Sequence, residues 1–297
     1  MRARLAIVFL VGLPSAALAQ DSLKFTVVTA GGWHTCAITT AGAAYCWGYG
    51  RFGQLGNGDT GVQTAPVPVA TGLRFTTISA GRFHTCGLTT DSIAYCWGTN
   101  GWGQLGSDSA PDSCTNREGK DRQVIACSLR PRAVAGDRHF ATLSVNGLHA
   151  CAITGDHEAY CWGSNRAGEL GIGPGSTWAH APIAVAGGLK FISVGSGLNH
   201  SCGVATSGEV YCWGDNLEGR LGVGGSSFTR RGWNTKPSPP KGDLRLTMIS
   251  AGDYHTCGVT TDGAVYCWGG NNEGQLGIGT TKGKNEPVRV SAVRVAP

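Results

Sequence analysis

One unit of sequence occurs five times along the chain, and this repetition constrains the fold more than any other feature. Each copy contains a histidine, a cysteine two residues later, a second cysteine ten residues after the first, and then the pair Trp-Gly. A Gly-x-Leu-Gly sequence follows in every copy. The histidines that anchor the copies are His34, His84, His149, His200 and His255. Five copies of so long a pattern predict five similar structural units.

Each unit is expected to form four short β-strands. Segments such as Phe75–Ile78, His84–Thr89 and Tyr95–Trp97 are short, rich in β-branched or aromatic residues, and bounded by glycine, which is typical of strands. A proline-valine segment, as at Pro66–Val69, is the fourth kind, and no window shows helical periodicity. Each unit has about 56 residues, which suits four-stranded blades arranged radially. The sequence therefore predicts an all-β propeller of five blades.

The last strand segment, Pro287–Val290, follows the fifth unit, and no such segment precedes Phe25 in the first unit. We expect this strand to supply the missing one, so that the two termini meet and close the ring. The prediction is a single propeller domain over residues 20–297 that is a monomer.

The first 19 residues have the order of a secretory signal peptide. Arg2 and Arg4 precede an apolar run, Leu5–Leu13, and the small residues of Ala17-Leu18-Ala19 follow. A retained membrane anchor is the alternative, but Pro14 interrupts the run before it reaches the roughly 20 residues of a spanning helix. No later segment is long enough to span, charged residues are only 14% of the chain, and the mean hydropathy is −0.06. We expect a protein that is secreted or periplasmic after cleavage near the end of this segment.

The chain has 12 cysteines, and ten of them form five pairs with nine residues between the partners. In a hairpin centred on the intervening turn, both cysteines of a pair point to the same face and lie opposite each other. We predict five disulfides within the units: Cys36 with Cys46, Cys86 with Cys96, Cys151 with Cys161, Cys202 with Cys212, and Cys257 with Cys267. The remaining pair, Cys114 and Cys127, is expected to pin a surface insertion at about residues 107–135.

Metal binding is the alternative for these cysteines, because a histidine and two cysteines recur in each unit. The chain lacks the paired C-x2-C turns that close zinc sites, so we expect neither a metal nor another cofactor. Nucleophile elbows, Walker loops, H-E-x-x-H and dinucleotide-binding fingerprints do not occur in the sequence. Five equivalent anchor histidines serve architecture, each bonding a backbone group inside its own unit, and no residue is predicted to be catalytic.

The repeated sequence Gly-x-x-His-Thr-Cys, followed by Tyr-Cys-Trp-Gly and Gly-Gln-Leu-Gly, resembles the regulator of chromosome condensation repeat. The resemblance covers residues 21–297 and implies a β-propeller, which this family usually builds with seven blades. It also implies an alternative function, that of a guanine-nucleotide exchange or GTPase-regulating factor. The chain departs from that pattern in two ways. It has five repeats rather than seven, and it is expected to be exported, which would place a GTPase partner on the other side of the membrane.

The residue before each anchor histidine differs among the units, although its neighbours stay the same. These residues are Trp33, Phe83, Leu148, Asn199 and Tyr254. If they lie on one rim of the ring, they give one face the apolar and aromatic composition of a protein interface. The alternative is that they pack between blades.

A second candidate surface is the segment from Phe228 to Thr247, called here the basic connector. Its candidate binding residues are Arg230, Arg231, Trp233, Lys236 and Lys241. They suit an acidic protein or surface polymer, and a solvated loop is the alternative. Specific nucleic-acid binding is not expected of an exported chain. Taken together, the sequence predicts a secreted, non-enzymatic scaffold that binds a protein or surface polymer through its rim loops.

Overall fold

The computed structural model of the chain describes residues 23–115, 123–225 and 233–291. The predicted signal peptide, Arg230 and Arg231 lie outside these ranges. The described residues form 21 β-strands and one short 3-10 helix, η1 (Leu217–Gly219). The all-β class is therefore confirmed.

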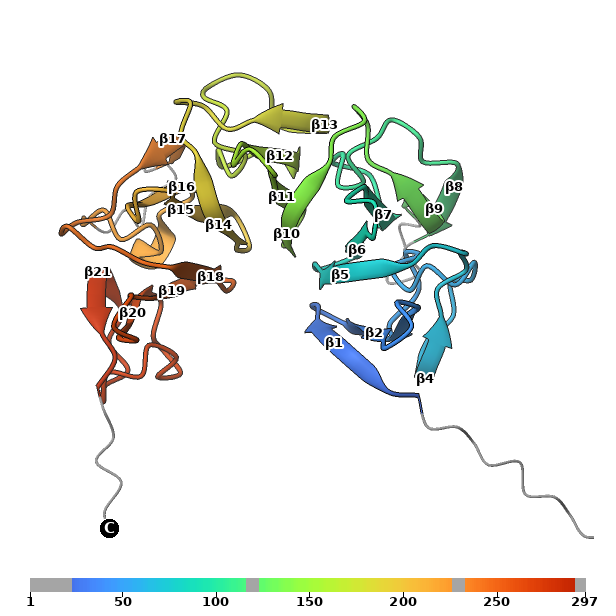
Figure 1. The fold of residues 1–297 in the computed structure, drawn as a ribbon, viewed down its shortest axis with the longest axis horizontal. Coiled ribbons are helices and arrows are strands. Elements are labelled where there is room, and N and C mark those ends of the chain that lie inside the picture. The colour runs from blue at the N-terminus through green and yellow to red at the C-terminus, as the bar shows by residue number, and fades with distance from the viewer. Residues whose placement is uncertain (1–22, 116–122, 226–232, 292–297) are drawn as a thin grey trace, which may run out of the picture.

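The strands form five antiparallel sheets, which are the blades (Figure 1). Blade 1 consists of β1 (Phe25–Ala30), β2 (His34–Thr39), β3 (Ala44–Gly48) and β4 (Gln63–Pro68). Blade 2 consists of β5 (Phe75–Ala80), β6 (His84–Thr89), β7 (Ala94–Thr99), β9 (Val124–Ala133) and the additional strand β8 (Asp112–Thr115). Blade 3 consists of β10 (Phe140–Asn146), β11 (His149–Thr154), β12 (Ala159–Ser164) and β13 (Trp178–Ala184). Blade 4 consists of β14 (Phe191–Ser196), β15 (His200–Ala205), β16 (Val210–Gly214) and β17 (Asn234–Ser238). Blade 5 consists of β18 (Met248–Ala251), β19 (His255–Val259), β20 (Val265–Gly269) and β21 (Lys284–Arg289).

The second and third strands of each blade form the hairpin that carries the paired cysteines. In blade 1 the register places Cys36 opposite Cys46, and their Cα atoms are 4.1 Å apart. The same pairing recurs in the other four hairpins, and the Cα distance is 5.9 Å in the sixth disulfide, Cys114–Cys127. All six predicted disulfides are present, and the described residues include no free cysteine.

The glycine of each Trp-Gly pair has a steric reason. Gly48 has a φ of +104°, and a Cβ there would lie 2.8 Å from the carbonyl oxygen of Trp33. The carbonyl is held at this distance because it accepts a hydrogen bond of 2.9 Å from the backbone N–H of Tyr49. Only glycine adopts this conformation readily and leaves room for the carbonyl.

The hydrophobic core consists of clusters between successive blades. Between blades 1 and 2, Ile38 and Leu55 pack with Phe75, Ile78 and Trp97. The corresponding tryptophans of blades 3 to 5 are also fully buried, as predicted for residues that pack between blades. Each indole lies against the last glycine of the Gly-x-Leu-Gly sequence in the preceding blade, which explains why that sequence is repeated.

Three of the five anchor histidines, His34, His149 and His200, bond a side-chain hydroxyl of the next blade, so for these three the expectation of a backbone bond inside one blade is wrong. The Nε2 atom of His34 lies 2.7 Å from the hydroxyl of Thr85 in blade 2, and that hydroxyl donates to the carbonyl oxygen of Gln54 at 2.9 Å. Burial lowers the pKa of His34 to about 4 and that of His149 to about 3, because a charged imidazole loses its hydration there. These side chains are therefore neutral at pH 7.

The predicted closing strand is a further difference between expectation and structure. β21 pairs with β20 and completes blade 5, and β1 pairs with β2, so each blade uses strands from one continuous segment. The blades follow an arc, and blades 1 and 5 lie at its two ends (Figure 1). Val28 on β1 is 69% exposed, whereas the corresponding Ile78 of blade 2 is 4% exposed. The terminal strands therefore do not close the ring in this structure.

Candidate functional site

The five residues before the anchor histidines occupy equivalent positions at one end of the blades. The carbonyl oxygens of Trp33, Phe83, Leu148, Asn199 and Tyr254 each accept a hydrogen bond from the residue that follows the Trp-Gly pair of the same blade. This shared backbone contact fixes where each side chain begins. What differs from blade to blade is the side chain itself.

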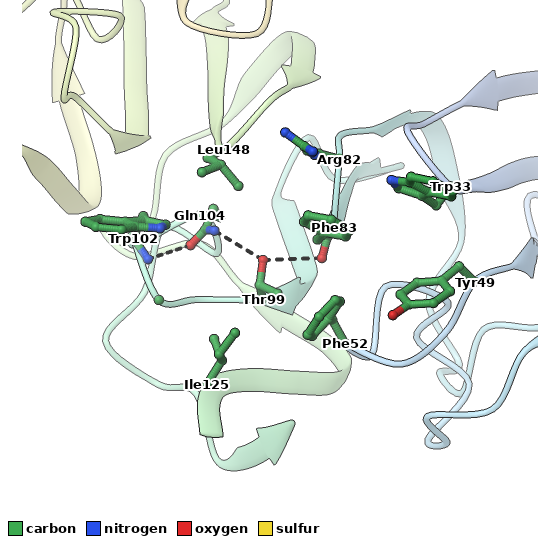
Figure 2. Close-up of a pocket in the computed structure, with 11 residues that line it drawn as sticks. Trp33, Tyr49, Phe52, Arg82, Phe83, Thr99, Trp102, Gln104, Ile125 and Leu148 are labelled. Carbon is green, nitrogen blue, oxygen red and sulfur yellow. Dashed lines mark hydrogen bonds between the residues drawn. The ribbon is translucent and has the colours of Figure 1, made fainter. Parts of the chain in front are cut away.

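Three of these residues, Trp33, Phe83 and Leu148, line one cavity of about 450 Å³ (Figure 2). We call this site the aromatic cavity, and blades 1, 2 and 3 contribute to it, together with the insertion. Its other lining residues are Tyr49, Phe52, Arg82, Thr99, Gly101, Trp102, Gln104 and Ile125. A volume of this size is typical of ligand pockets, and most of the lining side chains are apolar or aromatic.

A series of aromatic contacts forms one side of the cavity. The ring centroids of Trp33 and Tyr49 are 6.5 Å apart, those of Tyr49 and Phe52 are 5.9 Å apart, and those of Phe52 and Phe83 are 5.1 Å apart. Phe52 is 6% exposed, whereas Trp33 is 62% exposed. The series therefore extends from the buried ring of Phe52 to the indole of Trp33, which solvent or a partner can contact.

Hydrogen bonds position the polar groups of the cavity. Gln104 accepts a bond of 2.8 Å from the backbone N–H of Trp102 and donates one of 3.1 Å to the hydroxyl of Thr99 (Figure 2). Thr99 in turn donates to the carbonyl oxygen of Phe83 at 3.3 Å. Because Gln104 is 1% exposed, its bonds hold the backbone of the cavity in place rather than binding solvent.

The insertion supplies another side of the cavity. Phe52 is buried in a cluster with the disulfide Cys114–Cys127, and Ile125 and Phe83 pack against that cluster. The sixth disulfide thus stabilises the segment that carries Ile125. This disulfide was expected to pin the insertion, and the segment beside it carries Ile125, which lines the cavity.

Arginines surround the aromatic groups. The Cζ atom of Arg82 lies 5.4 Å from the ring centroid of Phe83, that of Arg51 lies 6.0 Å from Tyr49, and that of Arg166 lies 4.8 Å from Trp102. None of the three forms an ion pair with another described residue. The cavity is therefore apolar inside and positively charged at its border.

The remaining two residues of the set, Asn199 and Tyr254, do not line the cavity. Tyr254 lies under Arg220, whose Cζ atom is 5.0 Å from the ring centroid. The guanidinium of Arg220 also donates to the carbonyl oxygen of Asp253 at 3.2 Å, and Nη1 lies 3.7 Å from a carboxylate oxygen of Asp215. The set of five is therefore divided, with an apolar half over blades 1 to 3 and a polar half over blades 4 and 5.

The described part of the basic connector belongs largely to blade 4. Lys236 lies on β17, an outer strand, and Trp233 is 45% exposed just before it. Lys241 forms an exposed ion pair of 2.7 Å with Glu286 of blade 5, which joins the two outer edges. None of these residues lines the aromatic cavity.

The sequence analysis missed several cavity residues, notably Phe52 and Trp102. Both stand directly before the Gly-x-Leu-Gly sequence, where the other units have Ala167, Glu218 and Glu273. This position varies among units in the same way as the one before the histidine. The same comparison, applied to every variable position, would have found them.

Within the three described ranges, no group of three or more metal-binding side chains comes together, and no helix is long and apolar enough to cross a bilayer. Desolvation also lowers the pKa of the buried imidazole of His84 to about 3 and holds the pKa of His200 well below its usual value. These imidazoles contact neighbouring blades rather than the cavity.

Comparison with known proteins gives a consistent family. The sequence profile of the RCC1-like domain matches residues 11–296. The chain is 30% identical over 269 residues to the E3 ubiquitin-protein ligase HERC2 of Homo sapiens, which covers 90% of this chain and 4% of HERC2. It is also 30% identical over 286 residues to the ultraviolet-B receptor UVR8 of Arabidopsis thaliana, which covers 93% of this chain and 60% of UVR8.

Solved structures agree on the fold. The structure of Prp20p from Saccharomyces cerevisiae superposes with a TM-score of 0.74 and 21% identity, over 92% of this chain and 64% of that chain. Human WBSCR16 gives a TM-score of 0.57 and 19% identity, over 91% of this chain and 82% of the other. This chain thus spans less than two thirds of HERC2, UVR8 and Prp20p.

Proposed function

The chain belongs to the RCC1-like domain family, and from that premise we propose that it is a non-enzymatic propeller that binds a protein partner through the aromatic cavity. We further propose that it acts outside the cytoplasm, after cleavage of the signal peptide. Six disulfides support an oxidising compartment, where such bonds persist.

The observation that carries the proposal is the composition of the cavity. Aromatic side chains and arginine are enriched among the residues that dominate binding energy at protein interfaces. Here Trp33, Phe52, Phe83 and Trp102 line one cavity, and Arg82 stands at its border. The lining comes from three blades and an insertion, and most of its side chains differ from those at the same positions in the other repeats.

The same composition favours a protein over an acidic surface polymer. A polymer of charged groups gains little from an apolar cavity, whereas an apolar side chain on a protein loop is desolvated there. The arginines at the border suit carboxylates beside that side chain. The preferred partner therefore presents an apolar or aromatic anchor next to acidic residues.

For the second surface, the basic connector, we propose only that it can bind an acidic polymer. Lys241 is already paired with Glu286, and Lys236 lies on an outer strand. An acidic polymer that binds there would do so independently of the cavity.

Regulation of a GTPase, the alternative implied by the family, has no supporting observation in this chain. The binding of Prp20p to Gsp1p and histones belongs to that protein, and 21% identity shows a shared fold. We therefore do not propose it.

The test compares two variants at equivalent repeat positions. Trp33→Ala removes an exposed indole of the cavity, and Tyr254→Ala removes an exposed ring outside it. Immobilised residues 20–297 would be exposed to the native extracellular fluid, and the captured proteins would be quantified by mass spectrometry. We expect Trp33→Ala to lose at least one specific partner by more than tenfold, about 1.4 kcal/mol, while Tyr254→Ala retains it. Equal capture by both variants, or loss with Tyr254→Ala only, would contradict the proposal.

A further inference from the structure

The aromatic surface continues past the aromatic cavity onto blade 3. Trp102 lines the cavity, and in the view of Figure 2 it lies at the opposite end from Trp33. The ring centroid of Trp102 is also 6.1 Å from that of Trp178, at an interplanar angle of 62°. Trp178 begins β13, is 44% exposed and does not line the cavity. Trp102 is thus shared between the cavity and a second, exposed indole, and we call Trp102 and Trp178 the indole pair.

Close backbone packing holds the indole pair in place. Gly103 has a φ of +77°, and a Cβ there would lie 2.4 Å from the carbonyl oxygen of Ala179. The connection of blade 2 that carries Trp102 therefore lies directly against the strand that carries Trp178. Because this backbone is already packed, a ligand that contacts both rings would not have to order it first, and such ordering weakens binding elsewhere.

The indole pair is specific to blades 2 and 3. Trp178 precedes the residue that pairs with Gly163, and Trp233 precedes the residue that pairs with Gly214, so the two tryptophans are equivalent in blades 3 and 4. They are also equally exposed, at 44% and 45%. However, the residue that corresponds to Trp102 in blade 3 is Ala167, which has no ring to place beside Trp233.

Exposed arginines lie beside both parts of this surface. The Cζ atom of Arg166 lies 4.8 Å from the ring centroid of Trp102, and that of Arg82 lies 5.4 Å from the ring centroid of Phe83 in the cavity. Neither arginine forms an ion pair with another described residue. A guanidinium that stacks on a ring keeps its N–H groups available for a carboxylate. The surface therefore suits a ligand that has carboxylates close to its apolar groups.

The positive charge does not extend beyond Trp178. Two residues further along the chain, Nδ1 of His180 lies 3.7 Å from a carboxylate oxygen of Asp108. The side chain of Asp108 is 93% exposed, so its charge would repel a carboxylate of the ligand at this end. Acidic groups of a ligand are therefore expected beside Arg166 and Arg82 rather than beyond the indole pair.

We propose that the occupant of this surface is a linear acidic segment of the partner protein with two aromatic anchors, one in the aromatic cavity and the other on Trp178. The inference rests on the proposed function and adds a second binding subsite to it. One side chain cannot fill the cavity and also cover Trp178, whereas alternate side chains of an extended segment follow one another at about 7 Å on the same face. The carboxylates between the anchors bind Arg166.

The experiment uses three synthetic peptides with a fluorescein label, and fluorescence anisotropy measures their binding to residues 20–297 with disulfides intact. The first peptide has two tryptophans separated by Glu-Asp-Glu, and the second has alanine in place of one tryptophan. The third keeps both tryptophans and replaces the acidic residues with glutamine and asparagine. The first peptide is expected to bind tighter than either of the others by about tenfold or more, because its second anchor binds within the complex that the first has formed.

Variants of the protein locate the second anchor. With Trp178→Ala, the peptides with one and with two anchors are expected to bind alike, whereas Trp33→Ala weakens both. Trp178→Phe keeps a ring and is expected to restore most of the difference. Arg166→Gln is expected to reduce the preference for the acidic over the neutral peptide. The matched control is Val62→Ala, because Val62 holds the position of Trp178 in blade 1, is 56% exposed and lines neither subsite.

Three results would overturn the inference. If Trp33→Ala weakens binding but Trp178→Ala leaves the difference between the peptides intact, the second subsite does not exist, although the proposed function of the cavity stands. If Trp233→Ala removes the difference and Trp178→Ala does not, the acidic segment binds the basic connector. If wild type binds none of the peptides, or binds the neutral one as tightly as the acidic one, the occupant is not a linear acidic segment. The capture experiment with Trp33→Ala tests the proposed function independently of all three.

Discussion

Ala150 is an exception among the residues that face the anchor histidines. At the equivalent position, Ser201 places its hydroxyl 2.8 Å from Nε2 of His149 and donates to the carbonyl oxygen of Glu169 at 2.9 Å. Ala150 has no hydroxyl, and both ring nitrogens of His84 are buried without a well-formed hydrogen bond among the described residues. The change Ala150→Ser is therefore expected to stabilise the protein, which few substitutions in a buried core do.

The magnitude follows from the two bonds that Ser201 makes. A buried hydrogen bond contributes about 0.5–1.5 kcal/mol net, so two such bonds are expected to make Ala150→Ser more stable by about 1–3 kcal/mol in the free energy of unfolding. For a chain of this size, each kcal/mol raises the melting temperature by about 2–4 °C. The matched control, Ser201→Ala, removes such bonds and is expected to cost about 1–3 kcal/mol.

Differential scanning calorimetry at pH 7 measures both variants against wild type. The reasoning is refuted if Ala150→Ser melts at or below the wild-type temperature although Ser201→Ala melts lower. That outcome would mean that the space beside His84 does not admit a hydroxyl in the geometry of the other interfaces. If Ser201→Ala is also neutral, the hydroxyls do not stabilise the interblade contacts at all.

Three further predictions concern pH, the insertion and the core. The pKa of His34 is lowered to about 4 in the folded protein, whereas it is about 6.5 in the unfolded chain. As the pH falls below 6.5, His34 therefore takes up a proton in the unfolded chain before it does so in the folded protein. Stability is therefore full above pH 6.5 and falls toward pH 4 by about 1.4 kcal/mol per pH unit for each such histidine, and a flat denaturant-unfolding profile between pH 7 and 5 would contradict this. Replacing Cys114 and Cys127 with serine should weaken fluorescence binding of anilinonaphthalene sulfonate to the cavity, with little change in melting temperature. If the replacement lowers the melting temperature as strongly as it lowers the dye binding, this disulfide is instead part of the common scaffold. Leu105→Ala should cost about 2–5 kcal/mol, since Leu105 is fully buried between blades 2 and 3, and a cost below about 1 kcal/mol in urea unfolding would contradict that placement.

The hairpins could be predicted from the sequence because their determinants are local. A spacing of ten residues between Cys36 and Cys46 across a turn leaves few alternatives once side chains alternate. The tryptophans were predicted to pack between blades for a similar reason, since a large aromatic residue recurs once per unit. Local spacing, however, carries no information about the angle between one blade and the next.

The arc and the aromatic cavity depend on that angle. Val28 is covered only if the angles between the five blades add up to a closed ring. Side-chain packing between the blades sets these angles. The cavity likewise needs Trp33 and Phe52 of blade 1 to meet Phe83 of blade 2, and these residues are far apart in the sequence. Comparison of variable positions could identify such residues, but only the folded arrangement shows that they share one cavity.

Hydrogen exchange of the protein, alone and with its captured partner, tests the central claim most directly. If the partner binds the aromatic cavity, backbone exchange should slow at residues 49–53 and 100–106, which carry Phe52 and Trp102 and lie in connections rather than in the repeated hairpins. The hairpins themselves should exchange as before. Protection that appears only along residues 233–241, or only on the outer strands β4, β13 and β21, would contradict the account and place recognition on the outer edge of the blades.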